Sequence, residues 1–305
     1  MQNHACGDIF TDVRSVAIIG AGRVGGAMAI ALEGSGYSVD TVVFRGERYL
    51  GELKNVLPDT VRFARHSEFH SFNSEILIIA SGDPDIPSIA EWAAHLDHLP
   101  RFALHTSGSL SSLELDVLAK TGVSTASLHP LAAVSDPITG PERFRGAYFC
   151  VEGDAEAVEI AEKIARDMGG KPFSIPTHSK SLYHASAVMS AGHIVALMDA
   201  AIEMMTYCGL SSEEARDALL PLASGAVANL LDRPPASALT GPYARGDASA
   251  LERHLSAFAE AEIPSSLRAL YLDLAERSVA ILTAAGRRDL EALAESIRIA
   301  KQQGE

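Results

Sequence analysis

Three side chains in this sequence have the types and spacing that proton transfer needs. Lys180 and His184 are four residues apart in a segment with helical periodicity, so both lie on one face of the predicted helix. Thr177 is the predicted N-cap, which places the lysine in the first turn, where the positive helix end lowers the pKa of the amine. His129 directly follows a predicted strand. We predict that Lys180 is a catalytic acid or base and that His184 and His129 are its partners at a substrate oxygen.

Each of these residues also has a purely structural interpretation. A lysine at an unfavourable helix position is often a solvated surface residue, and a histidine within an apolar helix is often a core residue with satisfied hydrogen bonds. The sequence leaves these alternatives open.

Polar residues outside the apolar runs are the candidates for substrate binding. Ser107 and Gly108 follow a predicted strand, and the serine hydroxyl can bond a carboxylate or a hydroxyl group. Arg245 lies in the turn-rich stretch 240–247 and can clamp a carboxylate. Asn229 lies near the end of a predicted helix, on an otherwise apolar stretch. We predict that these four residues bind the substrate.

A glycine pattern near the N-terminus predicts a dinucleotide site. Gly20, Gly22 and Gly25 form G-x-G-x-x-G between an apolar strand-like run and an alanine-rich helical pattern. The first glycine permits a tight turn, the second lets the backbone approach a pyrophosphate, and the third allows close helix-strand packing. Phosphate would bind the free N–H groups at the helix N-terminus. The predicted cofactor-binding residues here are Gly20, Gly22, Arg23, Val24, Gly25 and, after a later strand, Ser81. Close helix-strand packing without a cofactor is the alternative.

The residue type after the second predicted strand bears on the choice of cofactor. NAD-preferring sites usually carry Asp or Glu about 20 residues beyond the glycines. Here that position is Arg45, and Arg48 follows closely. Because a guanidinium holds phosphate through a planar fork of donors, we predict that both arginines bind NADP, with NAD as the second choice of cofactor. Two solvated loop arginines are the structural alternative.

Apolar runs alternate with helical stretches through the first part of the chain. Strands are predicted at 16–19, 39–44, 60–63, 75–80, 102–105, 123–128, 147–151 and 171–175. The alternation predicts an α/β Rossmann domain, with a mostly parallel, doubly wound sheet and helices on both faces. Ligands of such sheets bind outside the carboxyl ends of the strands, where we expect Ser81, Ser107 and His129.

From residue 177 onward the sequence carries almost no strand signal. Helices are predicted at 179–207, at 212–231 with a break or kink at Pro221, and at 248–261, 264–285 and 288–302. Ser211 and Glu214 form a capping-box pattern, and Asp247 is a predicted N-cap. We therefore predict a Rossmann NAD(P)-binding domain over residues 1–176 and an all-helical substrate and dimerisation domain over residues 177–305.

The apolar segment 185–205 approaches the length that spans a membrane. His193, Asp199 and Glu203 interrupt it, and its small residues suit close packing between helices of a soluble domain. We predict a buried helix.

Composition narrows the class of partner. The 305 residues include 25 Lys plus Arg against 39 Asp plus Glu, a net charge of -14, which opposes binding to nucleic acid and anionic membranes. We predict a small-molecule substrate, no nucleic-acid or membrane partner, and a homodimer built through the apolar helices.

The sequence has three cysteines, Cys6, Cys150 and Cys208, an odd number without C-x-x-C spacing. This predicts no disulfide framework, no metal site and a cytoplasmic location.

The arrangement resembles a known group in which a Rossmann-type domain precedes a helical domain like that of 6-phosphogluconate dehydrogenase. The resemblance rests on G-A-G-R-V-G, H-T-S-G-S-L, L-H-P-L, the helix with Lys180, and T-G-P-Y-A-R-G-D. Within this group the chain is similar to a family with a Rossmann-like first domain and a C-terminal domain of unknown function, itself similar to ketopantoate reductases. The resemblance implies nicotinamide-dependent reduction or oxidation at the domain cleft, with the helical domain often forming a dimer.

Individual residues of this chain resemble those of two neighbouring enzyme families. Lys180 matches the lysine that hydroxyacid dehydrogenases and ketopantoate reductases place early in this helix, but those relatives carry Asn four residues later, where this chain has His184. Ser107 and His129 instead resemble the serine and the His-Pro histidine of prephenate dehydrogenases, where the histidine meets a substrate hydroxyl. The resemblance therefore leaves the substrate class open.

Motifs and resemblance together predict an NADP-dependent oxidoreductase. It would transfer hydride between nicotinamide and a small carboxylate-bearing carbonyl or hydroxyl compound, such as the 2-oxo acid ketopantoate. A prephenate-dehydrogenase-like enzyme is one alternative. A non-catalytic NADP-binding sensor or assembly protein is another, because a fold alone does not establish turnover.

Overall fold

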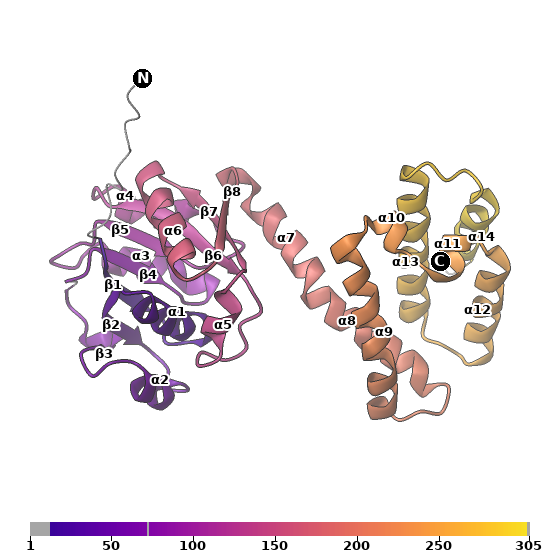
Figure 1. Ribbon diagram of the computed structural model, residues 1–305, viewed down its shortest axis with the longest axis horizontal. Coiled ribbons are helices and arrows are strands. Elements are labelled where there is room, and N and C mark those ends of the chain that lie inside the picture. Colours follow the sequence, from indigo (N-terminus) through magenta and orange to yellow (C-terminus); the bar gives the residue numbers. More distant parts are fainter. Residues whose placement is uncertain (1–12, 72, 304–305) are drawn as a thin grey trace, which may run out of the picture. The chain divides into compact units, whose positions relative to one another are not determined.

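The chain divides into two compact units, Met1–Ala191 and Gly192–Glu305. The computed structural model describes residues 13–71 and 73–303, so Cys6 lies outside the described residues. The first unit combines strands with helices, and the second is built from helices (Figure 1). The sequence predicts a domain boundary after residue 176, but the boundary between the compact units follows residue 191. The reason is that the helix that begins at Lys180 belongs to the first unit.

An eight-stranded sheet forms the centre of the first unit. Its strands are β1 (Ser15–Ile19), β2 (Ser38–Phe44), β3 (Arg62–Arg65), β4 (Ile76–Ile79), β5 (Phe102–His105), β6 (Ser124–Leu131), β7 (Tyr148–Gly153) and β8 (Lys171–Ser174). They lie in the order β3-β2-β1-β4-β5-β6-β7-β8, and each neighbouring pair is parallel except β6 with β7. The prediction of a mostly parallel, doubly wound sheet is confirmed.

Helices cover both faces of this sheet (Figure 1). One face carries α1 (Arg23–Gly34), α2 (Leu50–Val56), α5 (Gly140–Phe144) and α6 (Ala155–Asp167), and the other carries α3 (Ile86–Ala93) and α4 (Asp116–Ala119). Val16 and Ile18 of β1 pack into the core on the first face, while Ala17 and Ile19 pack into the core on the second. Burial on both faces explains why the strands read as continuous apolar runs.

Strand β6 is longer than its sequence predicts. We expected it to end at residue 128 with His129 beyond it, which is wrong, because β7 returns antiparallel and pairs with β6 as far as Leu131. His129 lies within β6 opposite Cys150. Ala126 and Leu128 pack into the core beneath α6, so alternation turns Ser127 and His129 to the opposite face of the sheet.

Short 3-10 turns connect several elements, and the last of them corrects a predicted cap. They are η1 (His66–Glu68), η2 (Asp83–Asp85), η3 (Ser112–Leu115) and η4 (Thr177–Ser179). Thr177 begins η4, so the prediction that it caps the following helix is wrong; Ser179 precedes α7 (Lys180–Ser190) and makes no side-chain capping bond. The prediction that Lys180 lies in the first helical turn is confirmed.

The second unit consists of helices throughout its described residues. They are α8 (Gly192–Thr206), α9 (Ser212–Asp232), α10 (Pro235–Ala238), α11 (Gly241–Arg245), α12 (Ala248–Glu260), α13 (Ser265–Ala284) and α14 (Glu291–Gln302). Two details differ from prediction: the long helix is interrupted at Ala191, and the stretch 240–247 contains the short α11. Of the break or kink predicted at Pro221, the break is absent, because Pro221 lies inside a continuous α9. Leu251, Leu272 and Ile297 belong to the core of this unit.

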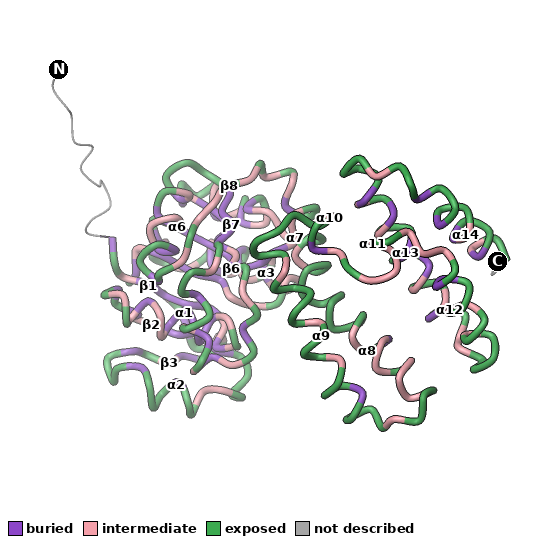
Figure 2. Tube along the Cα trace, turned by 45° about the vertical axis from the view of Figure 1, so that its right-hand side comes forward, coloured by how far each residue is buried: buried purple, intermediate pink, exposed green. Residues whose placement is uncertain are grey.

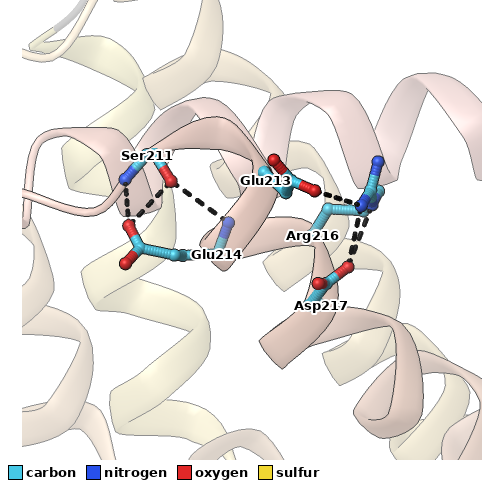
Figure 3. A network of polar contacts seen from close by, with 5 residues as sticks. All are labelled: Ser211, Glu213, Glu214, Arg216 and Asp217. Carbon is cyan, nitrogen blue, oxygen red and sulfur yellow. Dashed lines mark hydrogen bonds and ion pairs between the residues drawn. The ribbon is translucent and has the colours of Figure 1, made fainter.

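Two helix starts in this unit are capped as the sequence predicts. The Ser211 hydroxyl accepts the backbone N–H of Glu214, and the Glu214 carboxylate accepts the N–H of Ser211, which completes a capping box (Figure 3). The Asp247 carboxylate accepts the N–H of Ala250 at the start of α12. Both helix boundaries are therefore set by local side-chain chemistry.

The apolar segment 185–205 is not a buried helix in the single chain, contrary to the prediction. Its residues are exposed or half-buried, apart from Ala200, and α9 beside it is exposed along most of its length (Figure 2). By length and composition alone, the span Thr177–Thr206 is the one helical stretch among the described residues that could cross a membrane.

Candidate functional site

Two cavities lie at the carboxyl ends of the parallel strands of the first unit. The first has a volume of about 510 Å³ and lies beyond β1, β2 and β4. The second has a volume of about 390 Å³ and extends toward the end of β5 and the side of β6. Both are lined by Gly22, Ala80, Ser81 and Gly82. The cavities therefore meet at the turn between β1 and α1, on the edge of the sheet where ligands of this architecture bind.

The three glycines of the N-terminal motif have different surroundings. Gly20 has φ +118°, and a Cβ there would collide with the Ala80 carbonyl, while a Cβ on Gly25 would collide with the Gly20 carbonyl. A Cβ on Gly22 would meet no atom within 4 Å. Two glycines are thus required by packing inside the protein, whereas the openness at Gly22 leaves the backbone accessible to a ligand.

Unpaired polar groups gather at the same turn. Helix α1 begins at Arg23 without an acidic side chain in its first turn and without a side-chain cap, so its first N–H groups are available to an anion. The buried Ser81 hydroxyl makes no hydrogen bond within the described part of the chain. A pyrophosphate would supply acceptors to all of these donors. The residues present therefore fit a dinucleotide cofactor.

The arginines predicted to bind NADP line the first cavity. Arg45 donates from Nη2 and Nη1 to the two carboxylate oxygens of Asp85, at 2.7 and 3.3 Å. Arg48 lies with its guanidinium 5.1 Å from the ring centre of Tyr49. The structure thus brings both guanidinium groups to the first cavity, and adds the Asp85 carboxylate, which sequence reasoning missed.

A serine-rich loop after β5 forms one wall of the second cavity. The Ser107 hydroxyl accepts the N–H groups of Ser109 and Leu110, at 3.2 and 3.0 Å. Since the hydroxyl oxygen is used as an acceptor, its hydrogen is free to point at a ligand. Ser107 and Gly108 both line the cavity, as predicted for substrate-binding residues.

A buried histidine holds that loop in place. His105 Nδ1 accepts the N–H of Ser107 at 3.2 Å, and Nε2 lies 3.0 Å from the Ser111 carbonyl, so Nε2 carries the hydrogen. Burial lowers the pKa of His105 to about 4, which keeps the ring neutral. The sequence selected Ser107 and Gly108 of H-T-S-G-S-L as binding residues, and the structure adds that the first residue of this stretch, His105, supports the loop.

His129 lines the second cavity and is held from behind by a tyrosine. Its Nδ1 lies 2.7 Å from the Tyr183 hydroxyl, and the rings meet edge to face. A Cβ on Gly108 would lie 2.7 Å from His129 Nε2, so this nitrogen faces the cavity wall that Gly108 forms. Burial, with the nearby Lys180 cation as a smaller cause, lowers the pKa of His129 to about 3. The imidazole is therefore neutral near pH 7.

Lys180 is buried behind the cavity rather than exposed in it. Its side chain is 1% exposed, and Nζ donates to the Ser127 hydroxyl at 2.7 Å. Ser127 donates in turn to the Ser107 carbonyl at 3.3 Å. Burial lowers the pKa of the amine. The helix start and the sheet together place this lysine one serine away from the loop that lines the cavity.

His184 lies next to the same wall. Its ring is 6.0 Å from that of His129, at an angle of 83°, and a Cβ on Gly108 would collide with its ring. Gly108 is therefore required because two imidazoles approach the backbone there. The four-residue spacing predicts that Lys180 and His184 share one helix face, and both side chains lie toward β6, at Ser127 and His129 respectively.

The comparisons with known proteins divide the chain in two. A model of the Rossmann-like domain matches residues 1–130, and a model of a domain of unknown function, DUF2520, matches residues 147–278. The chain joins a Rossmann-like domain to a DUF2520 domain. His129 falls in the Rossmann-like match, while Lys180, Tyr183 and His184 fall in the DUF2520 match. The cluster at the second cavity is thus built from both parts of the sequence.

Solved structures share this fold. A protein from Thermotoga maritima is 24% identical with a TM-score of 0.69 over 89% of this chain and 100% of that chain. A proposed NADP oxidoreductase from Bacteroides fragilis is 22% identical with a TM-score of 0.65 over 87% and 97%. A reductive aminase from Aspergillus terreus, solved with NADPH and ethyl levulinate, is 18% identical with a TM-score of 0.58 over 94% and 99%. The chain therefore shares its fold with these three proteins, and two of them are described with NADP or NADPH.

A curated relative matches over a shorter stretch. Glycerol-3-phosphate dehydrogenase [NAD(P)+] from Rhizobium etli is 22% identical over 174 residues. The match spans about half of each protein, 52% of this chain and 52% of the dehydrogenase.

The Rossmann-like and DUF2520 segments bring together most of the residues selected from sequence. Gly22, Arg23, Val24, Arg45, Arg48, Ser81, Ser107, Gly108 and His129 line the two cavities, with Lys180 and His184 against them. Asn229, half-buried on α9, and Arg245, exposed at the end of α11, lie in the second compact unit, so their substrate-binding role stays a prediction.

Besides His105, sequence reasoning missed four polar residues at or behind the two cavities. Ser127 and His129 are two apart on one strand, and Lys180 and Tyr183 are three apart on one helix, so strand and helix periodicity carried a signal for Ser127 and Tyr183. Asp83 lines the second cavity and accepts the Ser109 hydroxyl, and Asp85 holds Arg45. Neither aspartate has such a signal. The described residues contain no group of three or more His, Cys, Asp or Glu arranged to hold a metal ion.

Proposed function

We propose that the chain is an NADP-preferring oxidoreductase that transfers hydride between nicotinamide and a small carboxylate-bearing carbonyl or hydroxyl compound, with a 2-oxo acid as the first substrate class to test. The observation that carries the proposal is the pair of cavities that share Gly22 and Ser81, with a neutral histidine facing the second one. The cofactor supplies the hydride when bound, and the protein supplies binding, orientation and proton transfer.

The cofactor would bind along the shared wall of the two cavities. The pyrophosphate would take the N–H groups at Arg23 and Val24 and the Ser81 hydroxyl. The adenosine end would lie in the first cavity, where Arg45 and Arg48 supply guanidinium groups to a 2'-phosphate. The second cavity would then hold the reacting end.

His129 is the proposed hydrogen-bond donor that polarises the substrate carbonyl oxygen. Burial raises the pKa of the Tyr183 hydroxyl, so the phenol keeps its hydrogen, and in the tautomer that we propose it donates this hydrogen to His129 Nδ1, 2.7 Å away. That bond assigns the imidazole hydrogen to Nε2, the nitrogen beside Gly108 at the cavity wall. A neutral imidazole in this tautomer can donate to a carbonyl oxygen as the oxygen gains charge.

Lys180 acts through Ser127 in this proposal rather than by direct contact with the substrate. Its Nζ hydrogen-bonds the Ser127 hydroxyl, which bonds the backbone of the loop that carries Ser107. The ammonium therefore orients the loop and adds positive potential near a developing oxyanion. His184 orients the substrate beside His129.

A second candidate substrate class is a compound with a C=N bond. The Asp83 carboxylate lines the second cavity and accepts the Ser109 hydroxyl. A carboxylate at this wall favours a cationic iminium group and disfavours an anionic substrate. The reductive aminase with the same fold acts as a precedent for that class.

Steady-state oxidation of NADPH tests the proposal with a panel of 2-oxo acids beside a panel of cyclic imines. Turnover with either panel supports an oxidoreductase and identifies the class, whereas cofactor binding without turnover on both panels favours a sensor. His129→Asn should reduce turnover about a hundredfold to ten-thousandfold with little change in NADP affinity. His98→Asn, an exposed histidine of the same unit, is the matched control and should leave turnover unchanged.

A further inference from the structure

We propose that Asp85 is a cofactor-specificity residue whose carboxylate competes with the 2'-phosphate of NADP for the Arg45 guanidinium. The competition weakens NADP binding and narrows the preference for NADP over NAD that an arginine at this position would otherwise produce. The inference rests on the proposed function, since it takes the first cavity to be the adenosine end of a dinucleotide site.

Arg45 and Asp85 meet at the wall of the first cavity from two different parts of the sheet. Arg45 follows β2, and Asp85 ends η2, just before α3. Both guanidinium nitrogens face the carboxylate, with Nη2 2.7 Å from Oδ2 and Nη1 3.3 Å from Oδ1, and both residues line the cavity. This two-point geometry is also the one with which a guanidinium holds a phosphate. Arg45 therefore cannot hold both anions in the same way at once.

Asp85 is the anchored member of the pair. Its backbone carbonyl accepts the Ser88 hydroxyl at 2.9 Å, and its position at the start of α3 places the carboxylate where the helix dipole favours negative charge. The Arg45 side chain is 80% exposed, compared with 34% for Asp85. When a phosphate takes the guanidinium, the arginine turns and the carboxylate stays.

The carboxylate also keeps its charge at neutral pH. The hydrogen bond from Arg45 lowers the pKa of Asp85 further below the neutral range. A 2'-phosphate that binds Arg45 within this cavity therefore lies near an ionised Asp85, and like charges repel. Two consequences oppose NADP: the existing ion pair must open, and the released carboxylate faces the phosphate. A ribose 2'-hydroxyl is uncharged, so its binding neither requires the ion pair to open nor is opposed by charge repulsion from Asp85.

A second exposed ion pair nearby provides a matched control. Arg65 pairs with Glu47, which belongs to the same β2–α2 connection as Arg45 but is not among the residues lining the cavity. Glu47→Gln therefore removes one negative charge and one exposed pair without touching the proposed competition.

The experiment measures the affinity of the full chain for two fragments that differ only in the 2'-phosphate, adenosine 2',5'-bisphosphate and adenosine 5'-monophosphate. Calorimetric titrations are made with wild type, Asp85→Asn, Arg45→Gln, the double variant and Glu47→Gln. Asp85→Ser, whose small uncharged side chain also suits the N-cap position, is a second variant in case the asparagine perturbs α3.

Asp85→Asn should tighten bisphosphate binding about two- to fivefold, the range expected when an exposed ion pair no longer competes. Monophosphate binding should not change, and Glu47→Gln should bind both fragments like wild type. In the Arg45→Gln background the gain from Asp85→Asn should be absent, because the competition runs through the guanidinium.

Three outcomes would overturn the inference, and they differ in what they say about the proposed function. An unchanged or weaker bisphosphate affinity in both Asp85 variants removes the competition and leaves the cofactor site standing. A gain that persists without Arg45 attributes the effect to charge alone and also removes the competition. If neither fragment binds wild type or Asp85→Asn, the cavity is no adenosine site, and the proposed function fails with the inference.

Discussion

Lys180 is a cation enclosed by protein, with the Ser127 hydroxyl as a hydrogen-bond partner. Such a position opposes folding, because an ammonium loses more on leaving water than one neutral hydrogen bond returns. A residue that is costly to the fold is expected where function requires it. Lys180 thereby differs from a solvated surface lysine, the alternative that the sequence leaves open.

We expect Lys180→Met to make the protein more stable and less active. Turnover should fall, by at most the roughly hundredfold to thousandfold that loss of one electrostatic stabiliser costs, with NADP affinity nearly unchanged, while the free energy of unfolding at pH 7 should rise by about 1 kcal/mol. Because burial lowers the folded-state pKa, the unfolded chain binds the proton more tightly, so the advantage of Met should shrink as pH rises toward about 10. Denaturant titrations at several pH values, beside steady-state rates, measure both effects. Normal turnover in the variant would end the functional claim for Lys180.

Buried neutral histidines make the stability of the first unit sensitive to acid. Burial lowers the pKa of His129 to about 3, below the unfolded value of about 6.5, so the unfolded chain binds more protons between these pH values. Stability should therefore be lost as pH falls from about 6.5 toward about 3. His129→Asn should reduce this slope when unfolding is followed across the range, whereas an equal slope in variant and wild type would contradict a histidine held neutral by the fold.

At the scale of elements, the turn from β1 into α1 separates packing glycines from a ligand-facing one. A Cβ on Gly25 would collide with the Gly20 carbonyl, but a Cβ on Gly22 meets no protein atom within 4 Å. Both interpretations of the motif therefore apply, each to a different glycine: Gly25 is required for close packing, and Gly22 leaves room for a ligand.

Two alanine substitutions test this division. Gly25→Ala should lower the thermal midpoint because backbone must move, whereas Gly22→Ala should melt like wild type and bind NADP at least tenfold more weakly, since the methyl occupies the approach to the helix N-terminus. Thermal melts and NADP titrations on both variants provide the readouts. If Gly22→Ala binds NADP with wild-type affinity, the proposal that the pyrophosphate binds at this turn is wrong.

Element length also decides what a residue can reach. Strand β6 continues to Leu131 because β7 pairs antiparallel with it, and this extension places His129 on a rigid strand opposite Cys150. The proposed hydrogen-bond donor, His129, is therefore held by backbone pairing on one side and by the Tyr183 hydroxyl on the other. Such double support favours a fixed orientation.

At the scale of the whole molecule, helices α8 and α9 pack against each other and leave much apolar surface exposed. Val195 is 70% exposed, Leu222 71% and Leu231 84%. Apolar surface of this extent along two helices is typical of an interface, and a second copy of the chain is the partner that we propose.

Light scattering on the purified chain should therefore report a dimer at micromolar concentration. Leu222→Glu and Leu231→Glu should shift the protein toward monomer, because each places a charge within the apolar surface. Leu113→Glu is the control, since this leucine is 68% exposed in the first unit, away from the two helices in sequence, and should leave the dimer intact. A monomeric wild type would reject the proposed homodimer.

The fold class followed from local patterns that the tertiary structure did not override. Apolar runs bounded by turns predicted the strands, and capping side chains such as Ser211 and Asp247 predicted helix starts correctly. The misplaced Thr177 cap and the absence of a helix break at Pro221 show the limit of this reasoning. A 3-10 turn and a proline within a helix satisfy the backbone in ways that residue type alone does not reveal.

By itself the sequence determined the chemistry available at the carboxyl edge of the sheet: glycines at a turn, guanidinium groups after β2, and serine and histidine beside β5 and β6. Only the tertiary structure decided which of these groups touch. Ser127 and Lys180 are 53 residues apart, and His129 and Tyr183 are 54 apart. Their contacts depend on strand order, on the face to which each side chain alternates, and on where α7 begins. Those are long-range properties, because burial and pairing are shared among segments distant in the chain, and no local pattern specifies them.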